Sequence, residues 1–426
     1  RGRNVEGLVF ARRALQLDAY DAKANFVAGN LYMAANDDLN ARETFGWAAR
    51  STTYRSIAYQ QLATLELRRG NDEEAFRYAG LALDYDAYAI PALHVLAVIA
   101  RGHGDSSGAI EILDRIAEID PISHVPSVER WLADGATRAR GDGELLARFR
   151  SEYPGQELLE LGLVYAALGR LDEARTIISR ADSTPIEPLS RAWLAYASRD
   201  VTHLEGGTDV DFVFPFRREM LPVLAWASSA SEHWSWAYLY GLALVARDRP
   251  VEGRRVLRGL GEAPDYAPAF TARALLAGAH ASDRERDLRR AVEMDPGQRL
   301  LRIPLVQHLQ GEGMWTEAAA ESTVALDAFP ADFDLALLHV KSLNELGLHE
   351  ESIEIMDDIQ VLPSEHSAEA QQLFSHAHIM AGVVALEGGQ ASAAVRHFGA
   401  AMTWPERLGQ GRPYEPEERL PRFLLG

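Results

Sequence analysis

The stretch that decides the fold is ANFVAGNLYMAANDDLNARETFGWAARSTTY, residues 24 to 54. In a frame that starts at Ala22, it has small residues at positions 8, 20 and 27 and larger apolar residues at positions 11 and 24. Small residues let two helices approach closely, and larger side chains fill the remaining space. The stretch therefore predicts a tightly packed pair of antiparallel helices. The residues at these positions are Gly29, Ala41, Ala48, Tyr32 and Phe45.

The same frame recurs along the chain. Frames start at Ala22, Ser56 and Ile90, so consecutive frames are 34 residues apart. A period of 34 residues with this pattern is typical of tetratricopeptide repeats, in which each unit is one helix pair. The predicted fold class is therefore all-α: a right-handed superhelical solenoid of antiparallel helix pairs with an irregular insertion. Further frames start at Gly155, Trp234, Asp265, Arg299 and Phe333, and a last unit covers 375–408.

Breaks in the period predict the domain organisation. The opening GLVFARRALQLDAY matches only the second helix of a unit, so we expect the first unit to be truncated upstream. Glycines such as Gly70 and Gly104 are expected to end the first helix of a pair. The expected segments are a first array over 1–123, an atypical helical pair over 124–154, a repeat unit over 155–188, an irregular insertion or hinge over 189–233, a second array over 234–408, and an extended cap over 409–426.

One run does not fit its repetitive surroundings. In DFVFPFRREMLPVLAWA, residues 211 to 227, three phenylalanines surround Pro215. Proline excludes a helix interior, and the isolation of the run argues against a sheet. We interpret it as an extended apolar plug between two arrays, because aromatic runs usually belong to the core. The alternative is a docking strip in which Phe214, Phe216 and Arg217 contact another module.

Composition excludes several classes of function. The net charge is −19, from 62 acidic and 43 basic residues, so we do not expect a nucleic-acid partner. The absence of cysteine excludes disulfides and thiolate metal sites. No apolar run is long enough to span a membrane. No metal-binding, phosphate-binding or nucleophile motif is recognisable, so we expect no cofactor and no catalysis by this chain alone.

Repeat arrays of this kind bind partners on the concave face, which the first helix of each pair lines. Asn30 alone matches the residues that clamp a peptide carboxylate, and its cationic companions are missing, so such a clamp is not expected. Downstream, Leu337, Lys341, Asn344 and Glu345 give a mixed surface without a distinct chemistry. The candidate groove residues of the first array are Phe26, Asn30, Gln60, Gln61, Arg68, His94 and Arg101.

A second aromatic stretch is SEHWSWAYLYGLAL, residues 231 to 244. Aromatic platforms bind sugars, so Trp234, Trp236 and Tyr238 are candidate sugar contacts. On a helix, however, this alternation distributes the rings around most of the circumference, and some must face inward. Packing is therefore the preferred interpretation.

The chain resembles a known family. The stretches YRSIAYQQLATLELRRGN, ALDYDAYAIPALHVLAVIAR, FVFPFRREMLPVLAWA and PDYAPAFTARALL occur in this order and resemble the C-terminal helical half of a family of large bacterial tetratricopeptide-repeat proteins of unknown function. The N-terminal half of that family is similar to a galactose-mutarotase-like β-supersandwich. The resemblance implies that a sugar-related module is missing upstream. From the repeat frames, the truncated first unit and the absence of a catalytic motif, we expect a non-catalytic scaffold that docks its own upstream β-sandwich module or a protein partner. The alternative is an accessory half of a glycan-processing enzyme. The resemblance assigns no catalytic residue to this chain. The cellular compartment is not determined, and the bacterial cytoplasm is slightly favoured.

Overall fold

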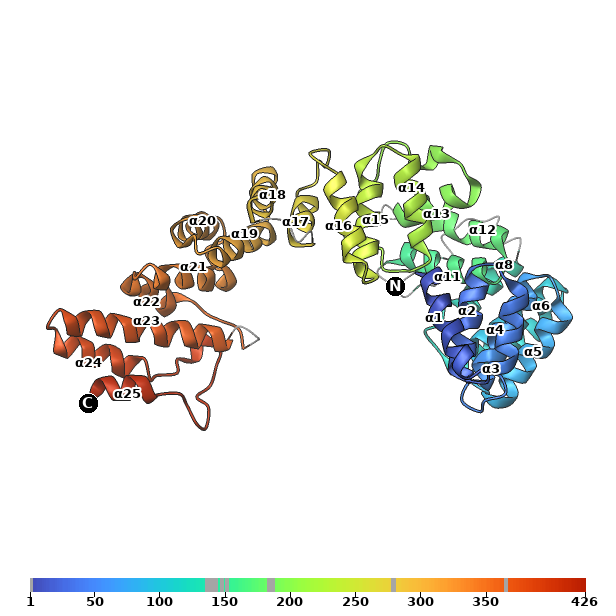
Figure 1. The fold of residues 1–426 in the computed structure, drawn as a ribbon, viewed down its shortest axis with the longest axis horizontal. Helices are drawn as coiled ribbons and strands as arrows, with labels where there is room; N and C mark the ends of the chain where they lie inside the picture. The colour runs from blue at the N-terminus through green and yellow to red at the C-terminus, as the bar shows by residue number, and fades with distance from the viewer. Residues whose placement is uncertain are drawn as a thin grey trace. The chain divides into compact units, whose positions relative to one another are not determined.

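The computed structural model of the chain describes residues 3–134, 145, 149, 153–181, 188–276, 281–363 and 367–426. Over these residues the chain is built from helices and loops without a β-strand (Figure 1). It forms two compact units, Arg1–Val256 and Leu257–Gly426. Both are arrays of antiparallel helix pairs, which confirms the predicted fold class. The division lies after Val256, whereas the sequence analysis starts the second array at Trp234.

The helices follow the predicted frames. Five first helices, α2, α6, α15, α19 and α21, begin at the residues where their frames start. The helices of the first unit are α1 (Asn4–Leu17), α2 (Ala22–Ala34), α3 (Asp38–Ala48), α4 (Arg55–Arg68), α5 (Asp72–Tyr85), α6 (Ile90–Gly102), α7 (Ser106–Ile119), α8 (Val125–Ala133), α11 (Pro154–Ala167), α12 (Leu171–Ala181), α13 (Pro188–Ser198), α14 (Met220–Ala230), α15 (Trp234–Ala246) and most of α16 (Pro250–Gly259), within which the division falls. Those of the second are α17 (Ala267–Leu276), α18 (Ala281–Met294), α19 (Arg299–Gly311), α20 (Trp315–Ala328), α21 (Phe333–Glu345), α22 (His349–Asp358), α23 (Ser367–Glu387), α24 (Ala391–Ala400) and α25 (Arg419–Leu425).

The turn inside each helix pair has one conformation. Position 15 of the frame has positive φ, as at Gly70 with +78° and Gly104 with +74°. This left-handed conformation is costly for most L-residues, which explains why glycine ends the first helix. Asn36 and Asp248 occupy the same position with φ of +57°, and these are the residue types that tolerate it best after glycine. The other glycines at this position are Gly169, Gly313, Gly347 and Gly389.

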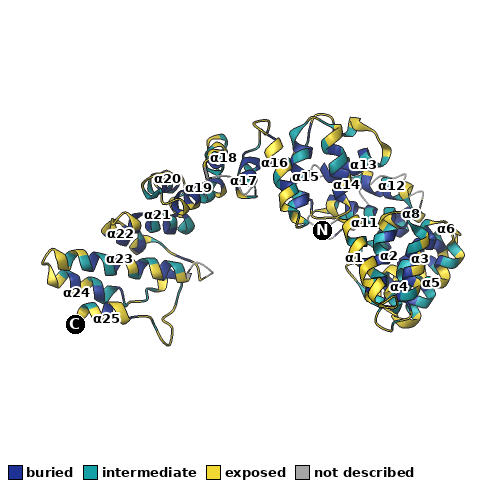
Figure 2. Ribbon diagram, viewed as in Figure 1, coloured by how far each residue is buried: buried dark blue, intermediate teal, exposed yellow. Residues whose placement is uncertain are grey.

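Close helix packing depends on position 8. A β-carbon built at Gly29 would lie 2.6 Å from the Phe45 ring, and one at Gly382 would lie 2.5 Å from the Phe398 ring. In each case the ring belongs to position 24 of the same frame. The predicted role of small residues is therefore confirmed at these two pairs, and the buried sides of the helices face one another (Figure 2).

The irregular segment proves to be an insertion inside a repeat pair. Helix α13 ends at Ser198, and the φ of +58° at the following residue, Arg199, matches the other position-15 residues. A loop with a short 3-10 helix, Val201–Leu204, replaces the usual tight turn before α14 packs against α13. The Arg191 guanidinium donates hydrogen bonds to two carbonyl oxygens of this loop, that of His203 at 3.1 Å and that of Gly207 at 3.3 Å.

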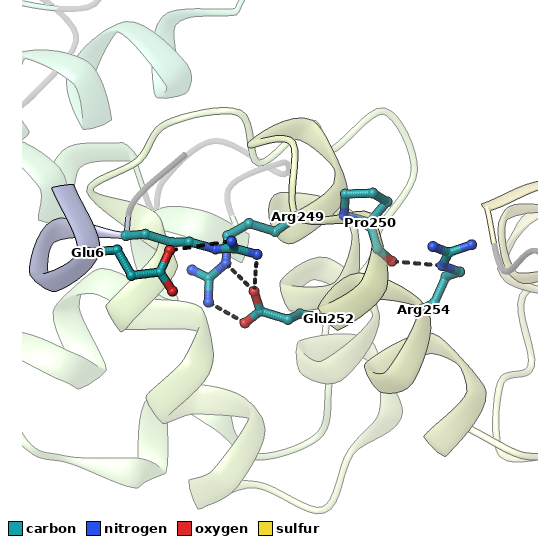
Figure 3. A network of polar contacts seen from close by, with 6 residues as sticks. Glu6, Arg249, Pro250, Glu252 and Arg254 are labelled. Atoms are coloured by element: carbon teal, nitrogen blue, oxygen red, sulfur yellow. Dashed lines mark hydrogen bonds and ion pairs between the residues drawn. The ribbon is translucent and has the colours of Figure 1, made fainter. Parts of the chain in front are cut away.

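The first and last helices of unit 1 meet through charged side chains. Arg3, at the start of α1, donates from Nη2 to Glu252 Oε1 at 3.0 Å. Arg249 also holds the Glu252 carboxylate, and Glu6 extends toward the same cluster (Figure 3). The hydrogen bond from Arg249, together with that from Arg3, lowers the pKa of Glu252 to about 2. The charged cluster therefore joins the two ends of this unit.

The C-terminal tail differs from the expected extended cap. Residues 410–418 lack a helix, but α25 forms over Arg419–Leu425. Glu418, which is buried, accepts from Arg412 at 2.7 Å and from Arg422 at 2.6 Å. These carboxylate contacts stabilise a short helix that the proline and glycine content of the tail did not predict. Among the described residues, no helix is long and apolar enough to cross a membrane.

Candidate functional site

The first array uses several of its predicted groove residues for packing. The Phe26 ring lies 5.8 Å from that of Phe45 and 5.6 Å from that of Tyr54. Asn30 donates to the Phe26 carbonyl oxygen at 2.9 Å, within its own helix. Gln60 donates to Ser56 Oγ at 3.2 Å. Gln61 is half-buried on the same helix as Gln60. Phe26 therefore packs between helices, while Asn30 and Gln60 bond within their own helices.

His94 and Arg101 belong to a buried network. Arg101 Nε donates to Glu129 Oε2 at 2.6 Å, and its Nη1 donates to Glu173 Oε1 at 2.9 Å. His94 Nε2 lies 3.6 Å from Glu129 Oε1, to which the Tyr165 hydroxyl also donates. Helix α6 is thereby connected to α8, α11 and α12. At this end of the array, His94 and Arg101 therefore contact other helices of the same unit.

The electrostatics of this network follow from its burial. Burial by itself raises the pKa of Glu129, but the nearby His94 and the hydrogen bond from Arg101 outweigh that effect and lower it to about 2. Burial, reinforced by the charge of Glu129, raises the pKa of Tyr165 well above its usual value. Glu129 is thus a carboxylate held charged inside the protein, and it acts as a structural anchor.

Arg68, another predicted groove residue, also has its contacts within the chain. It pairs with Asp38 and donates to the Met33 carbonyl oxygen at 3.3 Å. The turn between α11 and α12 packs so closely that a β-carbon at Gly169 would lie 2.8 Å from the Arg68 Cα. The structure therefore brings Arg68, His94 and Arg101 together with the 155–181 helix pair, and each has a partner within the chain.

The second unit has an open groove. A cavity of about 340 Å³ lies along the first helices of three consecutive pairs, α19, α21 and α23. Its apolar lining comes from Ile303, Leu337 and Leu338. Gln307 and Lys341 contribute polar side chains. Gln310, Gly311, Asp334 and Glu369 complete the lining. This is the surface on which repeat arrays bind extended ligands.

Two polar groups in this groove have fixed orientations. The Gln310 Nε2 donates to the Leu338 carbonyl oxygen at 2.7 Å and to Ser342 Oγ at 2.9 Å. Both amide hydrogens are then engaged, so Oε1 remains to accept a hydrogen bond from a ligand. Asp334 pairs with Arg299 through Oδ2 at 3.2 Å, while its buried Oδ1 has no hydrogen-bond partner in the described part of the chain.

Lys341 supplies the cation of the groove. The chain has only two lysines, Lys23 and Lys341, against 41 arginines. Within the described ranges no carboxylate lies within ion-pair distance of Lys341, whereas many arginines are paired. A flexible ammonium with three donors suits a carboxylate or a peptide carbonyl oxygen.

Several groove residues were missed by sequence reasoning, although the period contains the signal. Ile303 and Leu337 occupy position 5 of consecutive frames, and Gln307 and Lys341 occupy position 9. Leu337 and Lys341 were recognised as groove residues, and both line the cavity. Asn344 is instead buried, with its amide directed at the Leu373 carbonyl oxygen at 3.4 Å, and Glu345 is exposed outside the lining.

The interpretation of the aromatic run as a plug is wrong for the phenylalanines. Phe212 is 78% exposed, Phe214 69% and Phe216 41%. Val213 and Pro215 are the buried members, because alternate residues face opposite sides. Arg217, which follows the run, pairs with Glu160 on α11, and its Nε lies 3.2 Å from Glu160 Oε1. The apolar surface of the run therefore faces solvent.

The aromatic residues of α15 mostly face the core. Trp236 has no exposed surface and donates from Nε1 to the Leu204 carbonyl oxygen at 3.2 Å. Tyr238 is buried, and burial together with the charge of Asp211 raises its pKa to about 12. Trp234 is half-buried, 6.0 Å from the Tyr238 ring. Trp236 and Tyr238 thus anchor the insertion and present no stacking face to a sugar.

Among the residues that the structure describes, no three His, Asp or Glu side chains are placed to hold a metal ion. No protein-family model matches the chain, and no curated protein matches it.

Similar solved structures include yeast Tom70, with 14% identity over 95% of this chain and 94% of that chain and a TM-score of 0.28. A tetratricopeptide repeat protein from Parabacteroides merdae has 13% identity over 68% of this chain and 98% of that chain, with a TM-score of 0.25. Human IFIT1 has 15% identity over 80% of this chain and 76% of that chain, with a TM-score of 0.30. These similarities concern the fold alone.

Proposed function

We propose that this chain is a non-catalytic interaction scaffold that binds an extended protein segment in the groove of its second unit. The observation that carries the proposal is the cavity along α19, α21 and α23, which Gln307, Lys341 and their neighbours line at repeated frame positions. In the first unit, Arg68, His94 and Arg101 are engaged by other residues of that unit, so the open groove of the second unit is the better candidate.

The chemistry of the lining defines the ligand. Leu337 and Leu338 provide an apolar floor for one or two aliphatic or aromatic side chains. The Gln310 Oε1 accepts a hydrogen bond from a main-chain N–H group of the bound segment. Lys341 attracts a carboxylate close to the apolar side chain. The ligand class is therefore an extended peptide that combines a large apolar residue with a nearby Asp or Glu.

The source of this segment is part of the proposal. A neighbouring module of the parent protein, such as the β-sandwich implied by the family resemblance, is one source, and a separate protein is the other. The carbohydrate alternative receives no support from Trp236 or Tyr238, because their rings are buried.

The test is selection of random dodecapeptides displayed on phage against the immobilised full chain. Selected peptides should contain an apolar residue close to an acidic one, and they should bind in the micromolar range by calorimetry. Lys341→Ala should weaken their binding about tenfold, in line with the loss of one charge-assisted contact.

Lys23→Ala provides the matched control, since Lys23 is the other lysine and lies on α2, outside the groove. Its variant should bind like wild type. If no peptide family is enriched, or if Lys341→Ala binds as tightly as wild type, the proposed groove function is wrong.

A further inference from the structure

The aromatic strip, defined as Phe212, Phe214 and Phe216, is not explained by a groove in the other unit. The three rings share the solvent side of a loop, while Val213 and Pro215 face the core. Three exposed phenylalanine rings within five residues bring apolar surface to one loop, and apolar patches on folded proteins mark interaction sites.

The backbone at the start of the strip is strained. Phe212 has φ of +56°, in the left-handed region that bulky L-residues rarely adopt. Strain of this kind persists only when surrounding contacts impose it, and it clusters at functional positions. Here the surrounding contacts bury Val213 and leave the Phe212 ring 78% exposed, so the strain accompanies an outward-facing ring.

The charges around the strip are arranged symmetrically about Phe214. Phe212 and Phe216 lie two residues to either side, and Asp211 and Arg217 lie three residues to either side. If the strip is turned end for end, each phenylalanine falls on a phenylalanine and each charge falls on its opposite. This order of residues is complementary to itself when a second copy runs in the opposite direction, as in an interface with a two-fold axis.

Both charged groups have capacity for a further contact. Arg217 binds Glu160 through Nε and Nη2, which leaves the N–H groups of Nη1 for another acceptor. Asp211 is exposed, and within the described residues it forms no ion pair. Its nearest electrostatic partner is the neutral hydroxyl of Tyr238.

We propose that two copies of this chain associate through the aromatic strip in antiparallel orientation, with Phe214 of each copy at the two-fold axis. Asp211 of one copy then faces Arg217 of the other, and the phenylalanines pack against one another. Three partly exposed rings per copy bury less area than a stable dimer requires, so we expect a weak dimer in the micromolar range or above.

The first experiment is sedimentation velocity of the full chain over a wide range of concentrations. Wild type should shift from monomer to dimer as concentration rises, and Phe214→Ser should remain monomeric at every concentration. Phe76→Ser is the matched control, because Phe76 is 59% exposed on α5 of the same unit and should not affect association. A wild-type chain that stays monomeric, or a Phe214→Ser chain that still dimerises, overturns the proposal.

A charge exchange tests the antiparallel geometry separately. Asp211→Arg and Arg217→Asp are each made in a Glu160→Gln background, which removes repulsion between two carboxylates within one chain. Each variant alone should associate at least tenfold more weakly than the Glu160→Gln chain, because like charges then meet across the axis. An equimolar mixture of the two should recover association, since opposite charges face each other again. Failure of the mixture to recover overturns this geometry, and circular dichroism establishes that both variants are folded.

Discussion

Glu129 of α8 accepts a hydrogen bond from Arg101 of α6 at 2.6 Å, and the Glu129 side chain is only 1% exposed. The same carboxylate receives the Tyr165 hydroxyl of α11, and Arg101 reaches Glu173 of α12. One buried charge thus connects four helices whose positions in the sequence are far apart. It explains why Arg101 is engaged by carboxylates of its own unit.

Substitution of this carboxylate should destabilise the first unit strongly. Glu129→Gln keeps the size of the side chain but leaves Arg101 with Glu173 as its single carboxylate partner. We expect a loss of about 3 kcal/mol in the free energy of unfolding, the lower end of the range for breaking a buried ion pair. Urea denaturation monitored by circular dichroism measures this loss. Glu173→Gln should cost less, because Glu173 is more exposed; equal losses for the two variants would contradict the role assigned to Glu129.

The turn glycines should resist substitution for a backbone reason alone. Gly70 has φ of +78°, and a β-carbon there would meet no atom within 4 Å. Gly70→Ala should therefore destabilise the protein by about 1 kcal/mol through the left-handed conformation, without a steric clash. Gly80 is a matched control inside α5, where a β-carbon also has open space.

Gly80→Ala should stabilise by about 0.5–1 kcal/mol, because alanine has the higher helix propensity. Thermal unfolding of both variants beside wild type measures the two effects. Shifts in the same direction would contradict the assignment of Gly70 to a required left-handed turn.

Loss of the hydrogen bonds from Arg191 should make the loop between α13 and α14 more accessible to proteases. Arg191→Ala removes the two hydrogen bonds to the carbonyl oxygens of His203 and Gly207. The loop should then open more often, and thermolysin should cleave within 205–219 faster than in wild type. Mass spectrometry of the fragments locates the cleavage. Arg254→Ala, at an exposed arginine of α16 in the same unit, should leave the cleavage rate unchanged.

Mild acid should destabilise the second unit. Burial and the nearby His397 lower the pKa of His378, whose Nδ1 lies 3.2 Å from that of His397. Asp357 and Glu350 oppose this shift, and Arg407 adds to it. Because the folded-state pKa lies below the unfolded value of about 6.5, the unfolded chain binds more protons as the pH falls below that value.

Stability should therefore be fully present above the unfolded pKa and be lost as the pH falls from 7 toward the lowered value. Denaturant midpoints measured between pH 7.5 and 5 test this. In His378→Gln the dependence on pH should become shallower, while His103→Gln, an exposed control in the other unit, should keep the wild-type slope. A His378→Gln chain with an unchanged slope would rule out His378 as a source of the effect.

The sequence by itself determined the repeat, its period and the turn positions. Gly29 has to be small because Phe45 packs against it, and this pair recurs at a fixed spacing that a frame detects. Position 15 requires a left-handed residue, so glycine, asparagine or aspartate marks the end of a first helix even where the rest of the frame is weak, as at Asp248. These constraints act between residues that are close in the sequence. They can therefore be recognised from residue types at fixed spacings.

The tertiary structure alone decided which surfaces are open. Arg101 and Lys341 both lie on first helices, yet Arg101 is enclosed by helices from later in the chain, while Lys341 lines an open groove. Phe214 faces solvent because the insertion buries its neighbours Val213 and Pro215 instead. Burial depends on contacts between residues far apart in sequence, which hydrophobic patterning within one helix or loop does not specify.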